Sequence, residues 1–282
     1  MASPEPLKKK SRLLVWAIAL PFAALVALLA ALWFWTDTDT SLANALSQAA
    51  RYLPADQSLS TEGVRGSLRR GGQIEVLRWK NKDWTIEARK VDLSWQPFAL
   101  FDRRLQLESL RVSQLTIEGT GPSTAHTPLD HLELPFQVDV TFDVNGLRWT
   151  GPPSLDVQNL AGRYQFDNQR HSLNLTSAQV ASGHYSAQAT LLARAPLMLD
   201  ARLQGKLDTD VPGGKRSLPL DATASLKGDL AGLEGWLDVQ AKLQPSNPAA
   251  QATQANVSGK IKPWAAQPVV NADSTFSQLN LA

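Results

Sequence analysis

The 282-residue chain has no cysteine, only four histidines and two methionines, and few aromatic residues, at 7%. Without cysteine it has no thiolate metal ligand, no disulfide and no cysteine nucleophile, and this composition suits an exported protein as well as a cytosolic one. Charged residues are also scarce, at 19%, and the formal net charge is only +2. Because no basic stripe could neutralise a phosphate backbone, nucleic acid is not an expected partner.

Recognisable catalytic motifs are missing as well. The sequence has no GxSxG elbow, no phosphate-binding P-loop and no GxGxxG after a strand. His126 and His131 flank Asp130 in a turn-rich segment, and His171 and His184 are isolated, so we expect all four histidines to be solvated. We therefore predict no catalytic residue, no metal site, no cofactor and no enzymatic activity.

The most informative stretch lies near the N-terminus. Four basic residues within positions 8–12 precede 23 residues without a charge, from Leu13 to Trp35. As a helix this run spans roughly 34 Å, enough for a hydrocarbon core of ~30 Å. The expected anchor residues are Leu13, Trp16, Pro21, Trp33 and Trp35, the last two forming an aromatic belt at the far interface.

A cleaved signal peptide is the rival interpretation of this run. Such a peptide has an apolar region of about 7–15 residues and a small-x-small cleavage site. Here the run is longer and ends in Leu-Trp-Phe-Trp. We predict a cytoplasmic basic tail at 1–12, a single-pass transmembrane signal anchor at 13–35, and export of everything that follows.

Residues 36–55 predict a short amphipathic helix. Cap-type residues open the segment, apolar residues follow at helical spacing from Leu42 to Leu53, and Pro54 ends it. The helix would pack against the first strands or, alternatively, lie on the membrane surface.

Period-two alternation dominates the rest of the chain and predicts strands with one dry face and one wet face. In residues 197–207, for example, Leu199, Ala201 and Leu203 alternate with Arg202 and Gln204. We predict a first β block at 56–119, a Pro/Gly-rich linker at 120–135 and repetitive amphipathic strands at 136–282. The candidate residues of the apolar face are Val138, Val140, Leu197, Leu199, Ala201, Leu203, Leu218, Leu220, Leu237 and Val239.

A weak internal repeat accompanies the strands. Residues 77–96 are similar to residues 147–166, with Leu-Arg-Trp shared at an offset of 70. Repeated strand-turn units favour an elongated array over a closed sandwich. The tryptophans of the first block, Trp79, Trp84 and Trp95, are expected to close the end of the sheet, an aromatic ligand cage being the alternative.

Two motifs carry a resemblance to a known family. The chain has "GVRGSL" at 63–68 and "VDLSWQPFALFDRRLQLESLRV" at 91–112, after the apolar N-terminal run. In this combination the sequence resembles the N-terminal portion of the TamB family. This family is the inner-membrane subunit of the translocation and assembly module, within the AsmA-like, bridge-like lipid transfer group.

The resemblance implies an all-β fold after the transmembrane helix, in which a long sheet curls into an apolar-lined trough, or β-taco. It also implies a bacterial inner-membrane protein with its bulk in the periplasm. Its partners would be the inner membrane, acyl chains of phospholipids, and an outer-membrane barrel of the BamA/TamA type bound through a C-terminal domain absent here. The expected chain is thus an N-terminal portion, truncated at its C-terminus.

Three functions follow from this resemblance. The first is phospholipid transport between the inner and outer membranes in outer-membrane biogenesis. The second is assistance to outer-membrane protein or autotransporter assembly and protein secretion, and the third is a structural tether without transport. The apolar face discriminates between them, because a tether should bury it whereas a conduit leaves it lined but open.

Overall fold

The computed structural model of the protein describes residues 34–119, 130–151, 154–210, 217–247, 254–265 and 268–277. Within these ranges a single 14-stranded sheet is accompanied by an α-helix, α2 (Ser41–Arg51), and a 3-10 helix, η1 (Pro97–Asp102). The strands are β1 (Ser58–Glu62), β2 (Arg65–Ser67), β3 (Gly71–Lys80), β4 (Trp84–Trp95), β5 (Arg104–Gly119), β6 (Gln137–Trp149), β7 (Leu155–Phe166), β8 (Arg170–Val180), β9 (Gly183–Leu192), β10 (Met198–Asp210), β11 (Ser217–Asp229), β12 (Trp236–Pro245), β13 (Gln254–Ile261) and β14 (Val269–Ser277).

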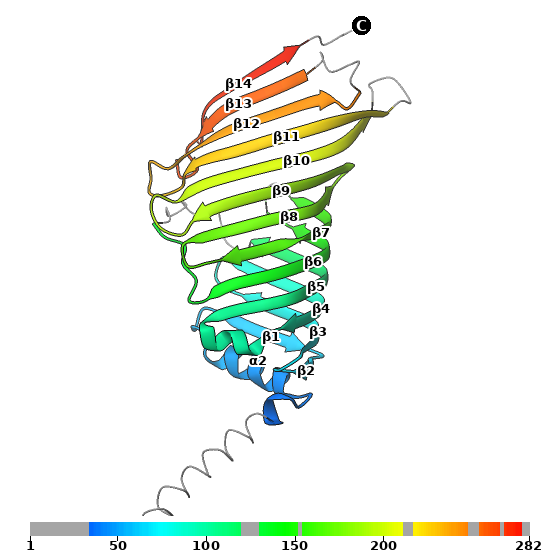
Figure 1. Ribbon diagram of the computed structural model, residues 1–282, viewed down its shortest axis with the longest axis vertical. Helices are drawn as coiled ribbons and strands as arrows, with labels where there is room; N and C mark the ends of the chain where they lie inside the picture. The colour runs from blue at the N-terminus through cyan, green and yellow to red at the C-terminus, as the bar shows by residue number, and fades with distance from the viewer. Residues whose placement is uncertain are drawn as a thin grey trace, which may run out of the picture.

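The strands pair almost entirely in chain order. The sheet runs β1-β3-β4 and then consecutively to β14, while β2 pairs with the start of β3. Neighbours are antiparallel except β5 and β6, which are parallel. Figure 1 shows the strands stacked along the long axis, from α2 at one end to β14 at the other. The expected all-β, open and curled sheet is confirmed.

Alternation along each strand is matched across strands, so each face of the sheet has one character. In β10, Leu203 is half-buried and lies opposite Ala224 of β11, whereas exposed Arg202 lies opposite Ser225. A register slip of one residue would move every leucine to the wet face. The apolar parity therefore holds the register of these long hairpins.

The internal repeat occupies matching places in the sheet. Leu77 and Leu147 belong to one cross-strand row, which runs through β4 and β5 between them. Trp79 and Trp149 share the next inward-facing row, and Trp84 contacts Trp149 with ring centroids 5.0 Å apart. Because β3 and β6 run in the same direction, the two copies of Leu-Arg-Trp occupy equivalent positions along their strands.

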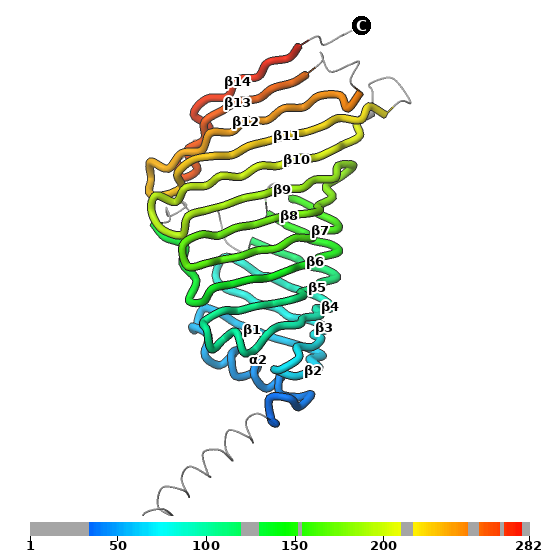
Figure 2. Tube along the Cα trace, viewed as in Figure 1, coloured from blue at the N-terminus to red at the C-terminus, as the bar shows by residue number. Residues whose placement is uncertain are grey.

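The apolar face is closed at the N-terminal end of the sheet. A cluster of five buried side chains comes from four consecutive strands, β3 to β6: Ile74, Ala88, Val91, Val112 and Val144. Ile74 is 1% exposed although no second sheet covers it among the described residues. Curling of the sheet over its own apolar face, with Leu46 of α2 packed against the cluster, excludes the water. Figure 2 shows the trace winding round at this end and spreading toward β14.

Polar contacts attach the segment leading into α2 to the first hairpin. Fully buried Ser41 accepts a hydrogen bond from the backbone N–H of Leu68 at 3.0 Å. The Asp37 carboxylate pairs with Arg70 at 2.9 Å and with Arg69 at 3.6 Å. The helix thus packs against β1 and β2, which is the first of the two roles considered for residues 36–55.

Glycine is required where the "GVRGSL" motif turns. Gly66 has φ +119°, and a Cβ there would lie 2.4 Å from the carbonyl oxygen of Gly71. A side chain would therefore separate β2 from β3. The motif thus allows the backbones of β2 and β3 to approach closely, and α2 packs against β2.

The predicted membrane span falls mostly outside the described ranges. Leu13, Trp16, Pro21 and Trp33 lie outside them, whereas Trp35 is exposed in the helical residues 34–36. Across the part of the chain that the structure describes, every helix is too short or too polar to cross a membrane.

The buried cluster predicts a matched pair of stability effects. Ile74→Ala should lower the free energy of unfolding by about 2–5 kcal/mol, because it leaves a cavity in a closed core. Val257→Ala, on the same face of β13 but 43% exposed, should change it by about 0.5 kcal/mol or less. Urea unfolding of the full chain in detergent, followed by tryptophan fluorescence, measures both. Equal midpoints for the two variants would contradict the closed core.

Candidate functional site: the apolar inner face

The inner face of β8–β14 is a series of apolar rows running across the strands. We define it by the side chains on the same face as Leu203. Two complete rows are Leu173-Ala189-Ala201-Leu226-Val239-Gly259-Ala272 and Leu175-Ala187-Leu203-Ala224-Ala241-Val257-Ser274. Both rows mix small residues, mostly alanine, with leucine and valine, and the second ends in Ser274. The floor is low, aliphatic and without charge.

Shelter from water decreases along this face. In β3–β6 the side chains are buried in the closed cluster. In β9 and β10, Ala187, Ala201 and Leu203 are only half-buried, and in β13 Val257 is exposed. Since a half-buried aliphatic side chain retains water contact, these rows offer apolar area that a ligand could still cover. The sheet is therefore packed shut at one end and lined but open toward the other.

The opposite face of the sheet is polar, and many of its charged side chains form ion pairs with one another. Arg163 donates to both carboxylate oxygens of Asp139, at 2.6 and 2.7 Å, and this hydrogen bonding lowers the pKa of Asp139. Arg78 likewise hydrogen-bonds Glu87 and lowers the pKa of that carboxyl. These cross-strand ion pairs fix neighbouring strands and keep the outer face wet.

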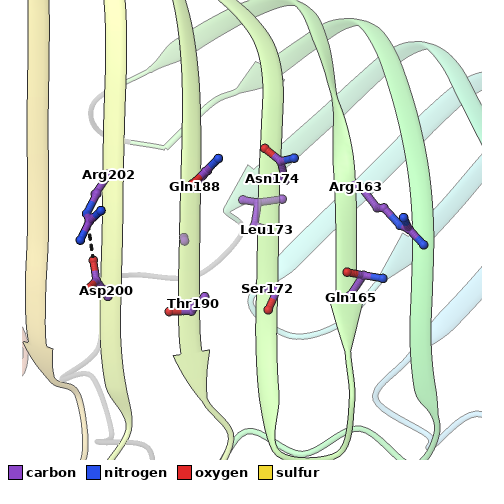
Figure 3. Close-up of a pocket in the computed structure, with 10 residues that line it drawn as sticks. Arg163, Gln165, Ser172, Leu173, Asn174, Gln188, Thr190, Asp200 and Arg202 are labelled. Carbon is purple, nitrogen blue, oxygen red and sulfur yellow. Dashed lines mark ion pairs between the residues drawn. The ribbon is translucent and has the colours of Figure 1, made fainter.

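A shallow recess lies on this polar face, across β7 to β10 (Figure 3). The side chains of the polar face that line it are Arg163, Gln165, Ser172, Asn174, Gln188, Thr190, Asp200 and Arg202. Its two arginines face carboxylates, Asp139 for Arg163 and, at 3.7 Å, Asp200 for Arg202. Asp200 also pairs with Lys227 at 3.1 Å. Both arginines of the recess are thus paired with a carboxylate, and Asp200 is shared between Arg202 and Lys227.

Across the described ranges, no group of three or more histidine, aspartate or glutamate side chains has the geometry of a metal site.

The first block, with α2, the Gly66 turn and η1 between β4 and β5, is where the chain resembles a known family. Residues 26–128 match the family model of the TamB N-terminal domain. This part of the chain is similar to TamB N-terminal domains. TamB proteins are membrane-associated. No curated protein and no solved structure matches the chain.

Beyond the matched residues, most of the predicted inner-face residues occupy the expected parity. Val138, Val140, Leu199, Ala201, Leu203 and Val239 are half-buried on the inner face, and Leu220 and Leu237 are buried there. Leu218, near the start of β11, is at the exposed end of the same parity. The alternation thus places these side chains together across β6 and β10–β12.

Leu197 differs from the other candidates. It precedes β10 and is 1% exposed, so it is buried and does not belong to an open lining. The residues leading into β6 lie nearby, since Leu132 donates its N–H to the carbonyl of Ala193 at 2.8 Å. Ala193 is fully buried. Contacts from a segment some sixty residues earlier therefore close this corner, which strand alternation does not indicate.

The expectation that His171 is a surface residue is wrong. Its side chain is 7% exposed and stacks on Phe166 with ring centroids 4.5 Å apart. His171 Nε2 lies 2.7 Å from the carbonyl of Leu132, so it carries the proton and donates. Nδ1 then accepts from the Tyr164 hydroxyl at 2.6 Å, and burial raises the pKa of that hydroxyl. The side chain of His171 thus joins β8 to the segment before β6 through its hydrogen bond to Leu132. We call this contact the His171 pin.

The other described histidines are exposed. His184 lies on the polar face of β9, and His131 forms a β-bridge with Arg194, whose side chain also pairs with Glu133. His126 lies outside the described residues. The sequence did contain an indication that His171 is buried. It lies two residues before Leu173 and four before Leu175, so a strand places all three side chains on the apolar face.

The pin predicts unequal effects of two histidine substitutions. His171→Ala leaves the Leu132 carbonyl and the Tyr164 hydroxyl without their buried partner, and should lower the free energy of unfolding by about 1–3 kcal/mol. His184→Ala, on the exposed polar face, should change it by about 0.5 kcal/mol or less. Urea unfolding of the full chain in detergent compares them. A His171→Ala midpoint at the wild-type value would show that the pin does not stabilise the corner.

Proposed function

We propose that the inner face of β8–β14 carries acyl chains of phospholipids between the inner and outer membranes, in outer-membrane biogenesis. The supporting observation is that its largely aliphatic rows are continuous across seven strands, half-buried in β8–β12 and more exposed toward β14. Apolar contact is non-directional, and each buried methylene contributes ~0.8 kcal/mol at any equivalent position. An acyl chain could therefore move along the rows without crossing a specific pocket.

The burial of the inner-face side chains indicates which part of the sheet would hold acyl chains. The cluster around Ile74 and Val112 fills the inner face in β3–β6. Acyl chains would accordingly occupy the part from β8 onward, with headgroups in water at the open side. The polar face, with its paired charges, would remain in solvent.

The tether hypothesis fits this gradient less well. A stalk that only connects two membranes gains stability from burying its apolar face, and it has no reason to leave aliphatic rows wet. No step of the proposed transport requires a catalytic residue, a metal ion or a cofactor. We therefore propose that the protein acts as a binding surface and not as an enzyme.

Photo-crosslinking at adjacent positions tests the conduit. A photoreactive residue at Leu203 should capture phospholipid in cells that express the full chain, because this position faces the aliphatic rows. The same residue at Gln204, one position on and on the polar face, should not. Mass spectrometry of the crosslinked adducts measures both. Equal capture at the two positions, or none at Leu203, would exclude the conduit for this segment.

Assembly of outer-membrane proteins is a second candidate, and one observation favours it. β14 pairs with β13 on one side and with no described strand on the other, and its side chains are largely exposed, Val270 by 54%. Within the described residues, the outer side of β14 presents backbone groups with which an unfolded β-strand, like any further strand of the same protein, can pair. Such a client would add to the sheet instead of lying on its inner face.

The two candidates predict capture of different molecules. If clients pair with β14, a photoreactive residue at Val270 should capture outer-membrane polypeptides in cells. One at exposed Lys242, in β12 and paired on both sides, should not. Immunoblotting for barrel proteins reads out the adducts. Lipid capture at Leu203 without polypeptide capture at Val270 would favour transport over assembly.

A further inference from the structure

A compact group of exposed apolar side chains surrounds η1. Phe98 is 54% exposed, Leu100 38% and Phe101 86%, although all three lie within one short turn. Phe98 and Phe101 stack on each other, with centroids 6.5 Å apart. The rings thus pack together outside the sheet. Grouped exposure of this kind marks an interaction surface more often than scattered single residues do.

A second chain segment adds to this group. The N–H of Gln137 donates to the carbonyl of Arg103 at 2.9 Å, which sets the start of β6 beside the end of η1. Phe136, immediately before it, is 43% exposed. We call Phe98, Leu100, Phe101, Phe136, Arg103 and Arg104 the η1 patch.

The geometry of the turn holds the patch outward. Pro97 occupies the first turn of η1, and Arg103 ends it in the left-handed region at φ 54°, with its N–H bonded to the carbonyl of Leu100 at 3.0 Å. The chain therefore reverses sharply between β4 and β5. On the strands that η1 connects, Leu93 and Leu110 instead pack against the closed cluster.

Charge around the patch is unbalanced. Arg103 and Arg104 are exposed, and the acidic residue in the same turn is Asp102. Arg104 also donates to the Gln137 side chain at 3.4 Å, while Glu108 is engaged by the Gln96 amide at 2.6 Å. The patch thus combines three phenyl rings and a leucine with a net positive charge. This combination matches the boundary between acyl chains and anionic headgroups.

The patch lies at the membrane end of the molecule. In Figure 1 the coil of η1, between β4 and β5, is at the same end of the long axis as α2. The uncharged run of residues 13–35 ends there. A surface at this height is within reach of a bilayer that holds the run.

We propose that the η1 patch inserts its phenyl rings into an anionic bilayer surface and sets the sheet upright on the inner membrane. Phe98 and Phe101 would enter the headgroup-acyl boundary, while Arg103 and Arg104 would pair with lipid phosphates. The opening of the inner face would then be held at a constant height above the membrane. This contact does not depend on lipid transport and can exist without it.

The absence of cysteine allows a direct test with single labels. Phe101→Cys and, as a matched control, Leu233→Cys are labelled with the fluorophore NBD in the full chain. Leu233 is a 67% exposed apolar residue in the turn between β11 and β12. Both proteins are reconstituted into vesicles of phosphatidylcholine with or without phosphatidylglycerol. Equal urea midpoints for the two labelled proteins establish that both are folded.

The label at Phe101 should emit at shorter wavelength and lose emission to spin-labelled lipids, at a depth of about 5–10 Å below the headgroups. The label at Leu233 should do neither. Arg103→Gln with Arg104→Gln should remove the gain in quenching that phosphatidylglycerol gives, and Phe98→Ser with Phe136→Ser should reduce quenching in both vesicles.

Two results would overturn the proposal. A label at Phe101 that stays open to aqueous iodide and unquenched by lipid in both vesicles would show that the patch does not touch the bilayer. A label shielded from iodide yet unquenched by lipid would show contact with a second copy of the chain. Either result leaves the crosslinking test at Leu203 untouched, so the two proposals fail separately.

Discussion

A single-layered sheet can shelter its apolar face only by curving over it. Most β domains bury that face against a second layer, and the described part of this chain has none apart from α2. Curvature completes the burial around Ile74 at the N-terminal end, where the short helix supplies Leu46. Where the curl opens, the same apolar parity continues without full cover. The closed core and the open inner face are thus two regions of one continuous sheet.

This arrangement gives a simple division of labour between the faces. The inner face provides continuous aliphatic area, and its small residues keep the floor low. The outer face provides cross-strand ion pairs, such as Arg163 with Asp139. Such exposed pairs add little stability individually, but they oppose like-charge contacts and specify which strands are neighbours. The ion pairs of the outer face and the apolar rows of the inner face thus favour the same strand register.

From β3 onward, the parallel pairing of β5 with β6 is the one break in a succession of hairpins among the described strands. It brings the segment before β6 to the corner of β8 to β10, where His171 and Ala193 hold it. The same segment brings Phe136 to η1. A single topological irregularity therefore supports both the pinned corner and the proposed membrane contact, on opposite sides of the strand start.

Local sequence determined much of this protein. Alternation in β10 assigns Leu199, Ala201 and Leu203 to one face, because successive strand side chains point to opposite sides. Helical spacing and Pro54 indicated the segment that contains α2, and the motifs at 63–68 and 91–112 indicated the similarity to TamB N-terminal domains. Tertiary structure alone decided that His171 is buried, because its imidazole bonds the carbonyl of Leu132 in a distant segment, and period-two patterns carry no information on such contacts. It also decided that Leu197, which precedes β10, is buried. It further decided that the rings of η1 are exposed, since they lie on a turn that reverses the chain between β4 and β5. Curvature, which separates closed core from open lining, arises from the whole sheet and has no signature in any one strand.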